Sequence, residues 1–150
     1  MRTRANVIVP DINLLLYAYD SQSPFHAAAA AWWQACLTGE EPVGLAPVVA
    51  FGFVRISTHP RVFEHPMSPA EAADHVRSWL AEPIVHLLEP RPDHVEHVLA
   101  SLEALGTAGN LVTDAQIAAL AIQHDAVLYT TDGDFMRFAG LRWRNPIVRR

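Results

Sequence analysis

Short apolar runs alternate along the chain with longer segments in which apolar residues recur every three or four positions. The runs have the length and composition of strands buried on both faces, and they lie at 6–9, 43–46, 84–88 and 127–130. The segments between them predict helices at 14–19, 23–37, 47–57, 69–81, 93–105 and 113–123. A last short strand is predicted at 141–144. This alternation predicts a three-layer α/β/α architecture with a mainly parallel central sheet, and residues 1–150 as one domain.

Two of the predicted helices carry start signals. Ser23 precedes Pro24, which places a capping hydroxyl directly before a residue suited to the first helical position. Ser68-Pro69-Ala70-Glu71 has the spacing of a capping box, in which serine and glutamate each bond the backbone of the other. We therefore expect the second helix to begin at Pro24 and the fourth at Pro69.

The composition is that of a soluble globular protein, since 51% of the residues are hydrophobic and 18% are charged. No apolar run approaches the roughly 18–20 residues that a membrane span needs. The apolar stretch near the start is interrupted by Pro10 and Asp11, which argues against a secretory signal. The single cysteine, Cys36, excludes an internal disulfide and a zinc pattern. We therefore expect a cytoplasmic protein that does not bind a membrane.

The distribution of charge is uneven. A formal net charge of −5 argues against a general nucleic-acid coat, which is usually basic. All eleven basic residues are arginines, and five of them fall within the last fourteen positions. A local basic patch binds phosphate even when the whole chain is acidic.

Acidic residues occupy the positions where an α/β domain binds ligands. Asp11 comes directly after the first predicted strand, and Asp132 directly after 127–131. Asp114 lies in the first turn of the helix that opens at 113, where the helix dipole favours an anion, and Asp134 follows two residues after Asp132. Ligands bind beyond the carboxyl ends of parallel strands, so we expect these acids to converge. Aspartates here also cap helices and turns, so spacing alone indicates only an acidic α/β site.

Converging carboxylates repel one another unless a cation compensates them. Oxygen ligands without a cysteine or histidine cluster select Mg²⁺ or Mn²⁺. Such a cation activates water and stabilises charge on a phosphodiester under attack. The acids therefore point to a metal site formed by Asp11, Asp114 and Asp132, with Asp134 as the fourth candidate.

Three ordered motifs resemble a known family. Pro10-Asp11-Ile12-Asn13-Leu14-Leu15 is similar to the D-x-N-x-L opening of PIN-domain nucleases. The segment at 109–120 resembles the D-A-x-x-A-A helix of the family, and 129–135 resembles its closing T-x-D-x-D-F. The match covers nearly the whole chain, and it resembles most the VapC toxins of toxin–antitoxin pairs.

The resemblance implies an endoribonuclease toxin of a type II toxin–antitoxin system, which cleaves RNA and so inhibits translation. It implies Asp11, Asp114 and Asp132 as catalytic metal ligands, some of them through water, and Asn13 and Thr131 as groups that orient carboxylates or water. Its expected partners are RNA, a cognate antitoxin and a second copy of the chain. We predict that the arginine-rich end contacts RNA phosphates or antitoxin acids, through Arg142, Arg144, Arg149 and Arg150.

One position departs from the family pattern. Many of these toxins carry a glutamate in the helix after the second strand, where this chain has Gly52. Glu41 is the nearest acid upstream, but it lies on the wrong side of that strand. We expect Gly52 to leave a gap facing the metal, which Asp134 or water would fill. The missing glutamate also motivates the alternative that the chain is a catalytically weakened module, which binds RNA or an antitoxin without cleaving.

Other families with an aspartate after the first strand fit less well. Phosphatases with an aspartyl nucleophile use Asp-x-Asp, where this chain has Asp11-Ile12-Asn13. Receiver domains and P-loop proteins both need a lysine, and the chain has none.

Overall fold

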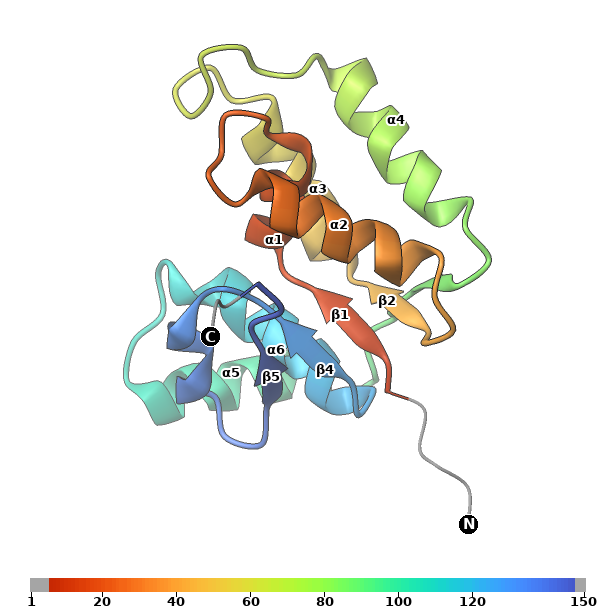
Figure 1. Ribbon diagram of the computed structural model, residues 1–150. Coiled ribbons are helices and arrows are strands. Elements are labelled where there is room, and N and C mark those ends of the chain that lie inside the picture. Colours follow the sequence, from red (N-terminus) through yellow and green to blue (C-terminus); the bar gives the residue numbers. More distant parts are fainter. Residues whose placement is uncertain (1–5, 148–150) are drawn as a thin grey trace.

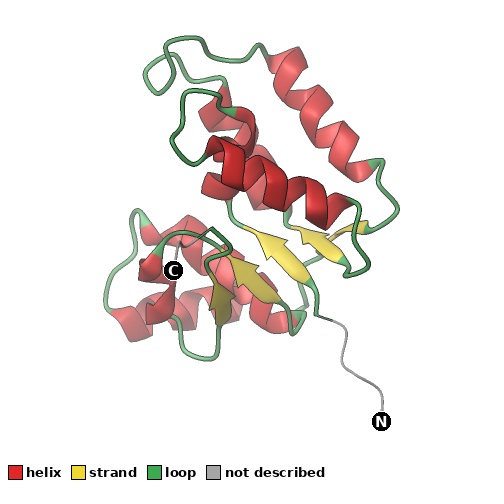
Figure 2. Cartoon of the chain, in the orientation of Figure 1, coloured by secondary structure: helices red, strands yellow, loops and turns green. Residues whose placement is uncertain are grey.

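The computed structural model describes residues 6–147, which form a five-stranded parallel sheet between two layers of helices (Figures 1 and 2). The strand order is β3-β2-β1-β4-β5, and every neighbouring pair is parallel. The strands are β1 (Ile8–Pro10), β2 (Val43–Leu45), β3 (Val85–Leu87), β4 (Val127–Tyr129) and β5 (Arg142–Arg144). The predicted α/β/α architecture is confirmed, and the predicted last strand is present at the sheet edge.

Within residues 6–147, six α-helices and one 3₁₀ helix connect the strands. In Figure 1, α1 to α4 lie on one side of the sheet, toward the top of the view, and α5 and α6 lie on the other side, behind β4 and β5. The helices are α1 (Ile12–Tyr19), α2 (His26–Leu37), α3 (Pro47–Ser57), α4 (Pro69–Leu80), α5 (His94–Leu105), α6 (Leu111–Gln123) and the 3₁₀ helix η1 (Gly133–Arg137). No helix in the described part of the chain is long and apolar enough to cross a membrane.

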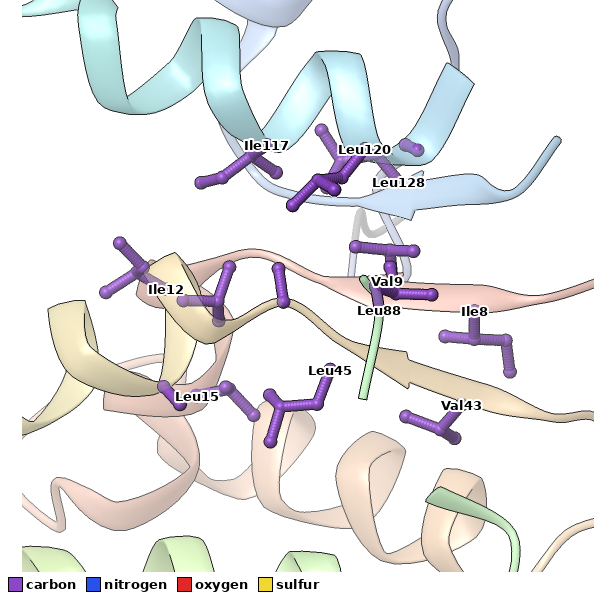
Figure 3. Packing of buried hydrophobic residues seen from close by; sticks show 14 of the residues in the cluster. Ile8, Val9, Ile12, Leu15, Val43, Leu45, Leu88, Ile117, Leu120 and Leu128 are labelled. Carbon is purple, nitrogen blue, oxygen red and sulfur yellow. The ribbon is translucent and has the colours of Figure 1, made fainter. Parts of the chain in front are cut away.

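Apolar side chains fill both sides of the sheet, which explains why the strands read as continuous apolar runs. Figure 3 shows Ile117 and Leu120 of α6 near Leu128 on one side, while Leu15 and Leu45 pack on the other. All five side chains are at most 3% exposed. The sheet is therefore held between two apolar layers, and its strand ends are rigid supports for the residues that follow them.

The helix starts were predicted with mixed success. The capping box is confirmed, because the Glu71 N–H donates to Ser68 Oγ at 3.1 Å and the Ser68 N–H donates to Glu71 Oε1 at 3.4 Å. The start at Pro24 is wrong. Ser23 Oγ instead accepts from the Phe25 N–H at 3.1 Å in a local turn, so α2 begins only at His26.

The direction of the chain across the sheet reverses between β1 and β4. The chain runs from β1 outward to β2 and β3, and then returns to place β4 on the other side of β1. The loops after β1 and β4 therefore leave the sheet in different directions, and a crevice opens between them at the carboxyl ends of the strands. Asp11 and Asp132 lie in these two loops.

Candidate functional site

A cavity of about 360 Å³ lies at this crevice. Three of its lining residues are among the four aspartates that the sequence singled out, and they come from the loop after β1, from α6 and from the loop after β4. The complete lining is Asp11, Ile12, Asn13, Arg55, Ile56, Gly109, Asn110, Thr113, Asp114 and Asp132. The predicted convergence of Asp11, Asp114 and Asp132 is therefore present in the structure.

Asp11 is held in place by two hydrogen bonds. It directly precedes α1, and its Oδ1 accepts from the Ile12 N–H at 2.7 Å, so it caps this helix. Its Oδ2 accepts from the Thr130 hydroxyl at 2.7 Å. Burial raises the pKa of Asp11, these two hydrogen bonds lower it, and the charge of Asp132 raises it. Asp11 is only 4% exposed, so its two hydrogen bonds fix its orientation and its protein surroundings determine its pKa.

Thr130 links the two strand-end aspartates. Its fully buried hydroxyl donates to Asp11 and accepts from the Asp132 N–H at 3.0 Å. The sequence assigned such an orienting role to Thr131, but the structure gives the side chain of Thr131 no hydrogen bond among the described residues. The hydroxyl that orients a carboxylate in the structure is that of Thr130, and an orienting role of Thr131 toward water stays a prediction. The side chain of Asn13 lines the cavity and likewise forms no hydrogen bond within residues 6–147, so the predicted orientation of a carboxylate by Asn13 is not seen.

Asp132 combines a local structural role with its place in the cavity. Its Oδ1 accepts from the Asp134 N–H at 2.9 Å and so caps η1, a helix that the sequence did not indicate. The second oxygen of the carboxylate has no hydrogen bond among the described residues. Asp134 is exposed and does not line the cavity, although its charge reaches Asp114. It therefore differs from the other three acids in its surroundings.

Asp114 is the aspartate whose ionisation is most strongly affected. It lies half-buried in the first turn of α6. Burial raises its pKa to about 6, and the charges of Asp11, Asp132 and Asp134 add to the rise. The four carboxylates are therefore close enough to repel one another, and no described cation neutralises them.

The donor set fits a hard divalent cation. Within residues 6–147, no three acidic, histidine or cysteine side chains lie close enough together to hold an ion directly in this arrangement. Oxygen atoms are nevertheless the only strong ligands lining the cavity, and their repulsion calls for positive charge. Mg²⁺ commonly retains several waters in such sites, which allows carboxylates to hold it at a distance.

Gly52 does not face the cavity. A Cβ atom at this position would lie 3.1 Å from Cγ1 of Ile12 and closer still to its Cδ1. Gly52 is buried, and the expected gap is filled by the Ile12 side chain, which itself lines the cavity. The expectation of an open space facing a metal is therefore wrong. Glu41 is also remote, because it precedes β2 and the cavity lies beyond the opposite end of the strands.

The arginines of β5 lie outside the cavity. Arg142 donates to the Asp125 carbonyl at 2.7 Å and to Asp125 Oδ1 at 3.3 Å, beside the amino end of β4. Arg144 lies next to Tyr129, where its charge lowers a tyrosine pKa that burial raises. Arg149 and Arg150 lie outside the described residues. The cation that does line the cavity is Arg55 of α3, to which the sequence analysis assigned no role.

The fold and its pocket define an α/β domain with an acidic, oxygen-lined site at the reversal of the sheet. A PIN domain model matches residues 8–141. The chain is 46% identical to ribonuclease VapC33 of Mycobacterium tuberculosis over 141 residues, which are 94% of this chain and 99% of that protein. Ribonuclease VapC37 of the same organism is 38% identical over 138 residues, covering 92% of this chain and 96% of that protein. The chain therefore belongs to the PIN-domain family, within its group of VapC ribonucleases.

Solved structures agree on the fold. The VapC20 toxin of Mycobacterium tuberculosis, described as cleaving the sarcin–ricin loop, superposes with a TM-score of 0.67 at 19% identity, over 90% of this chain and 98% of that one. VapBC2 from Rickettsia felis, bound to a fragment of promoter DNA, gives a TM-score of 0.66 at 16% identity, over 93% of this chain and 98% of that one. At these identities the likeness supports the fold alone.

Proposed function

We propose that this chain is a Mg²⁺- or Mn²⁺-dependent endoribonuclease that acts as the toxin of a toxin–antitoxin pair. The observation that carries the proposal is the convergence of Asp11, Asp114 and Asp132 in one cavity, in a chain 46% identical to a ribonuclease. When bound, a divalent cation supplies Lewis acidity and neutralises charge on a phosphodiester. Asp11, Asp114 and Asp132 would hold it, and Asp134 would strengthen the local negative field.

The protein groups have distinct tasks in this mechanism. Thr130 and the Ile12 N–H keep Asp11 in one orientation and favour its ionised form. Burial and the neighbouring acids raise the pKa of Asp114 to about 6 in the metal-free chain, and a bound cation would favour its ionised form. The caps at the starts of α1 and η1 tie Asp11 and Asp132 to the backbone, so little reorganisation is needed when substrate arrives.

The proposed partners follow from the same comparisons. Several structures with this fold are VapBC complexes, which supports a cognate antitoxin as a protein partner here. RNA is the proposed substrate because the relatives are named ribonucleases. A homodimer is proposed from the family resemblance, and the cytoplasm is the proposed location of both RNA and enzyme.

The test is cleavage of RNA by the purified chain. We expect internal cuts in the presence of Mg²⁺ or Mn²⁺, loss of cleavage with a chelator, and loss in Asp11→Asn, which keeps the side-chain shape but removes its charge. Calorimetric titration should show weaker Mn²⁺ binding in Asp11→Asn and in Asp114→Asn, with circular dichroism unchanged. RNA binding without metal-dependent cleavage would refute the nuclease proposal and favour the weakened binding module.

A further inference from the structure

Arg55 is the only basic residue among those lining the acidic cavity within the described part of the chain. It lies in the last turn of α3 and is exposed to solvent. Helices α3 and α6 contact each other, so Arg55 and the first turn of α6 border the same space. The guanidinium group of Arg55 therefore lies at the same cavity as the cluster of aspartates.

Arg55 does not neutralise these carboxylates. Within residues 6–147 its guanidinium forms no hydrogen bond and lies within 4 Å of no acidic oxygen, whereas Arg77 and Arg142 each pair with an aspartate. The pKa of Asp114 is raised by its acidic neighbours, and Arg55 is not among the groups that offset this rise. The charge of Arg55 is thus left for a partner outside the described chain.

The neighbouring polar groups indicate what kind of partner this is. Asn13, Asn110 and Thr113 also line the cavity, and their side chains form no hydrogen bonds among the described residues. Amide and hydroxyl groups of this kind bind phosphate and sugar oxygens in nucleic-acid complexes, and arginine binds phosphate through two parallel N–H groups. An acidic cavity repels RNA, so a cation at its border offsets part of that repulsion.

We propose that Arg55 positions RNA at the active site by binding a backbone phosphate that flanks the one to be cleaved. The flanking phosphate is chosen because Arg55 lies beyond ion-pair distance of the carboxylates, so an anion held by its guanidinium sits beside the acids and not among them. The inference rests on the proposed ribonuclease function. It makes Arg55 a substrate-binding residue, in contrast to the arginines of β5.

The test measures RNA binding separately from cleavage. Binding of a fluorescent single-stranded RNA would be followed by anisotropy in Ca²⁺ at several salt concentrations, for the parent chain, Arg55→Ala, Arg55→Lys and Arg77→Ala. Arg77 is a matched control because it is an exposed arginine on α4, which packs against α3 and β3 and contributes nothing to the cavity lining. Both alanine variants change the net charge equally.

We expect Arg55→Ala to weaken RNA binding about tenfold. The slope of log affinity against log salt should fall by roughly 0.7, the value for one phosphate contact on a single strand. Arg55→Lys should keep the slope and lose part of the affinity, because lysine retains the charge without the paired donors. Arg77→Ala should match the parent, and Mn²⁺ affinity and the free energy of unfolding should stay unchanged in all variants.

The outcomes separate this inference from the proposed function. Equal RNA affinity and salt slope in Arg55→Ala and the parent would overturn the role of Arg55 while leaving cleavage intact. RNA binding that depends on Arg55, in a chain that does not cleave, would refute the nuclease function and keep the binding role. A parent chain that does not bind RNA would overturn both. The same variants would also be tested for binding of a fluorescent acidic peptide. If Arg55→Ala loses binding to this peptide while its RNA binding is unchanged, Arg55 serves a protein partner and the proposal is overturned.

Discussion

Replacing Thr130 by valine removes one hydroxyl and leaves the size of the buried side chain nearly unchanged. The variant loses the hydrogen bond to Asp11 at 2.7 Å and the bond from the Asp132 N–H at 3.0 Å. A hydrogen bond to a charged group contributes about 1.5–3 kcal/mol, and the second bond adds roughly 0.5–1 kcal/mol because water can replace it at half-buried Asp132. We therefore expect Thr130→Val to lower the free energy of unfolding by roughly 2–4 kcal/mol at pH 8.

This loss should depend on pH. The Thr130 hydroxyl lowers the pKa of Asp11, which burial raises, so removing it raises the pKa further. An acid whose pKa is higher in the folded than in the unfolded chain stabilises the fold at low pH, and this contribution is lost as the pH rises through the folded value. Because the pKa of Asp11 is higher in the variant, the variant loses more stability than the parent as the pH rises. The difference in stability between them should therefore be larger at pH 8 than at pH 4.5.

The assay is urea unfolding of metal-free protein at both pH values, with Thr131→Val as the control. The control removes a neighbouring hydroxyl that forms no hydrogen bond among the described residues, so its effect should be small and independent of pH. Equal destabilisation by the two substitutions would refute the assignment of Thr130, as would a Thr130→Val effect that is the same at pH 8 and pH 4.5. Reduced Mn²⁺ affinity in Thr130→Val alone would extend the role to the metal site.

Three further predictions test other features of the site. Asp114→Asn should raise the thermal midpoint of the metal-free chain at pH 7.5 but much less at pH 4.5. The pKa of Asp114 is raised to about 6, so its unfavourable ionised form is present mainly at the higher pH. Calorimetry that gives the same shift at both pH values would count against repulsion between Asp114 and its acidic neighbours. Gly52→Ala should lower the free energy of unfolding in urea by about 1–3 kcal/mol, because the added methyl group overpacks against Ile12. Ile12→Val removes the closest atom, so the double variant should recover part of this stability. If Gly52→Glu instead binds Mn²⁺ more tightly than the parent and is equally stable, the position faces the metal. Arg142→Ala should leave RNA affinity within twofold of the parent, since Asp125 already engages this arginine, and a tenfold loss by anisotropy would return the arginines of β5 to the RNA interface.

The acids at the strand ends were predictable because a parallel sheet imposes their position. Whatever follows β1 and β4 must emerge at the same edge of the sheet, so Asp11 and Asp132 converge whatever the details of their loops. Asp114 followed from its place in the first turn of a helix that packs on the sheet. Their roles as helix caps and as lining of the cavity were weighed as alternatives, yet Asp11 and Asp132 perform both at once.

The remaining details depend on contacts that a linear pattern does not contain. Which of two adjacent threonines turns inward is decided by the backbone after β4, so Thr130 could not be told from Thr131. Whether position 52 faces the cavity depends on how α3 packs against α1. There Ile12 occupies the space that a side chain at position 52 would need. The engagement of Arg142 with Asp125 required the register of β5 beside β4.

The bond between Thr130 and Asp11 joins residues 119 positions apart. During synthesis β1 is made first, yet the strand that completes its environment is β4, and all of α1 to α6 are made between them. Contacts between such distant segments form late, because the intervening chain must first be ordered. A nascent chain that ends before β4 holds Asp11 at an uncovered sheet edge and lacks Asp132 altogether. The pocket therefore arises only after β4 has been made and has paired with β1, and any cutting activity that it carries cannot precede this pairing.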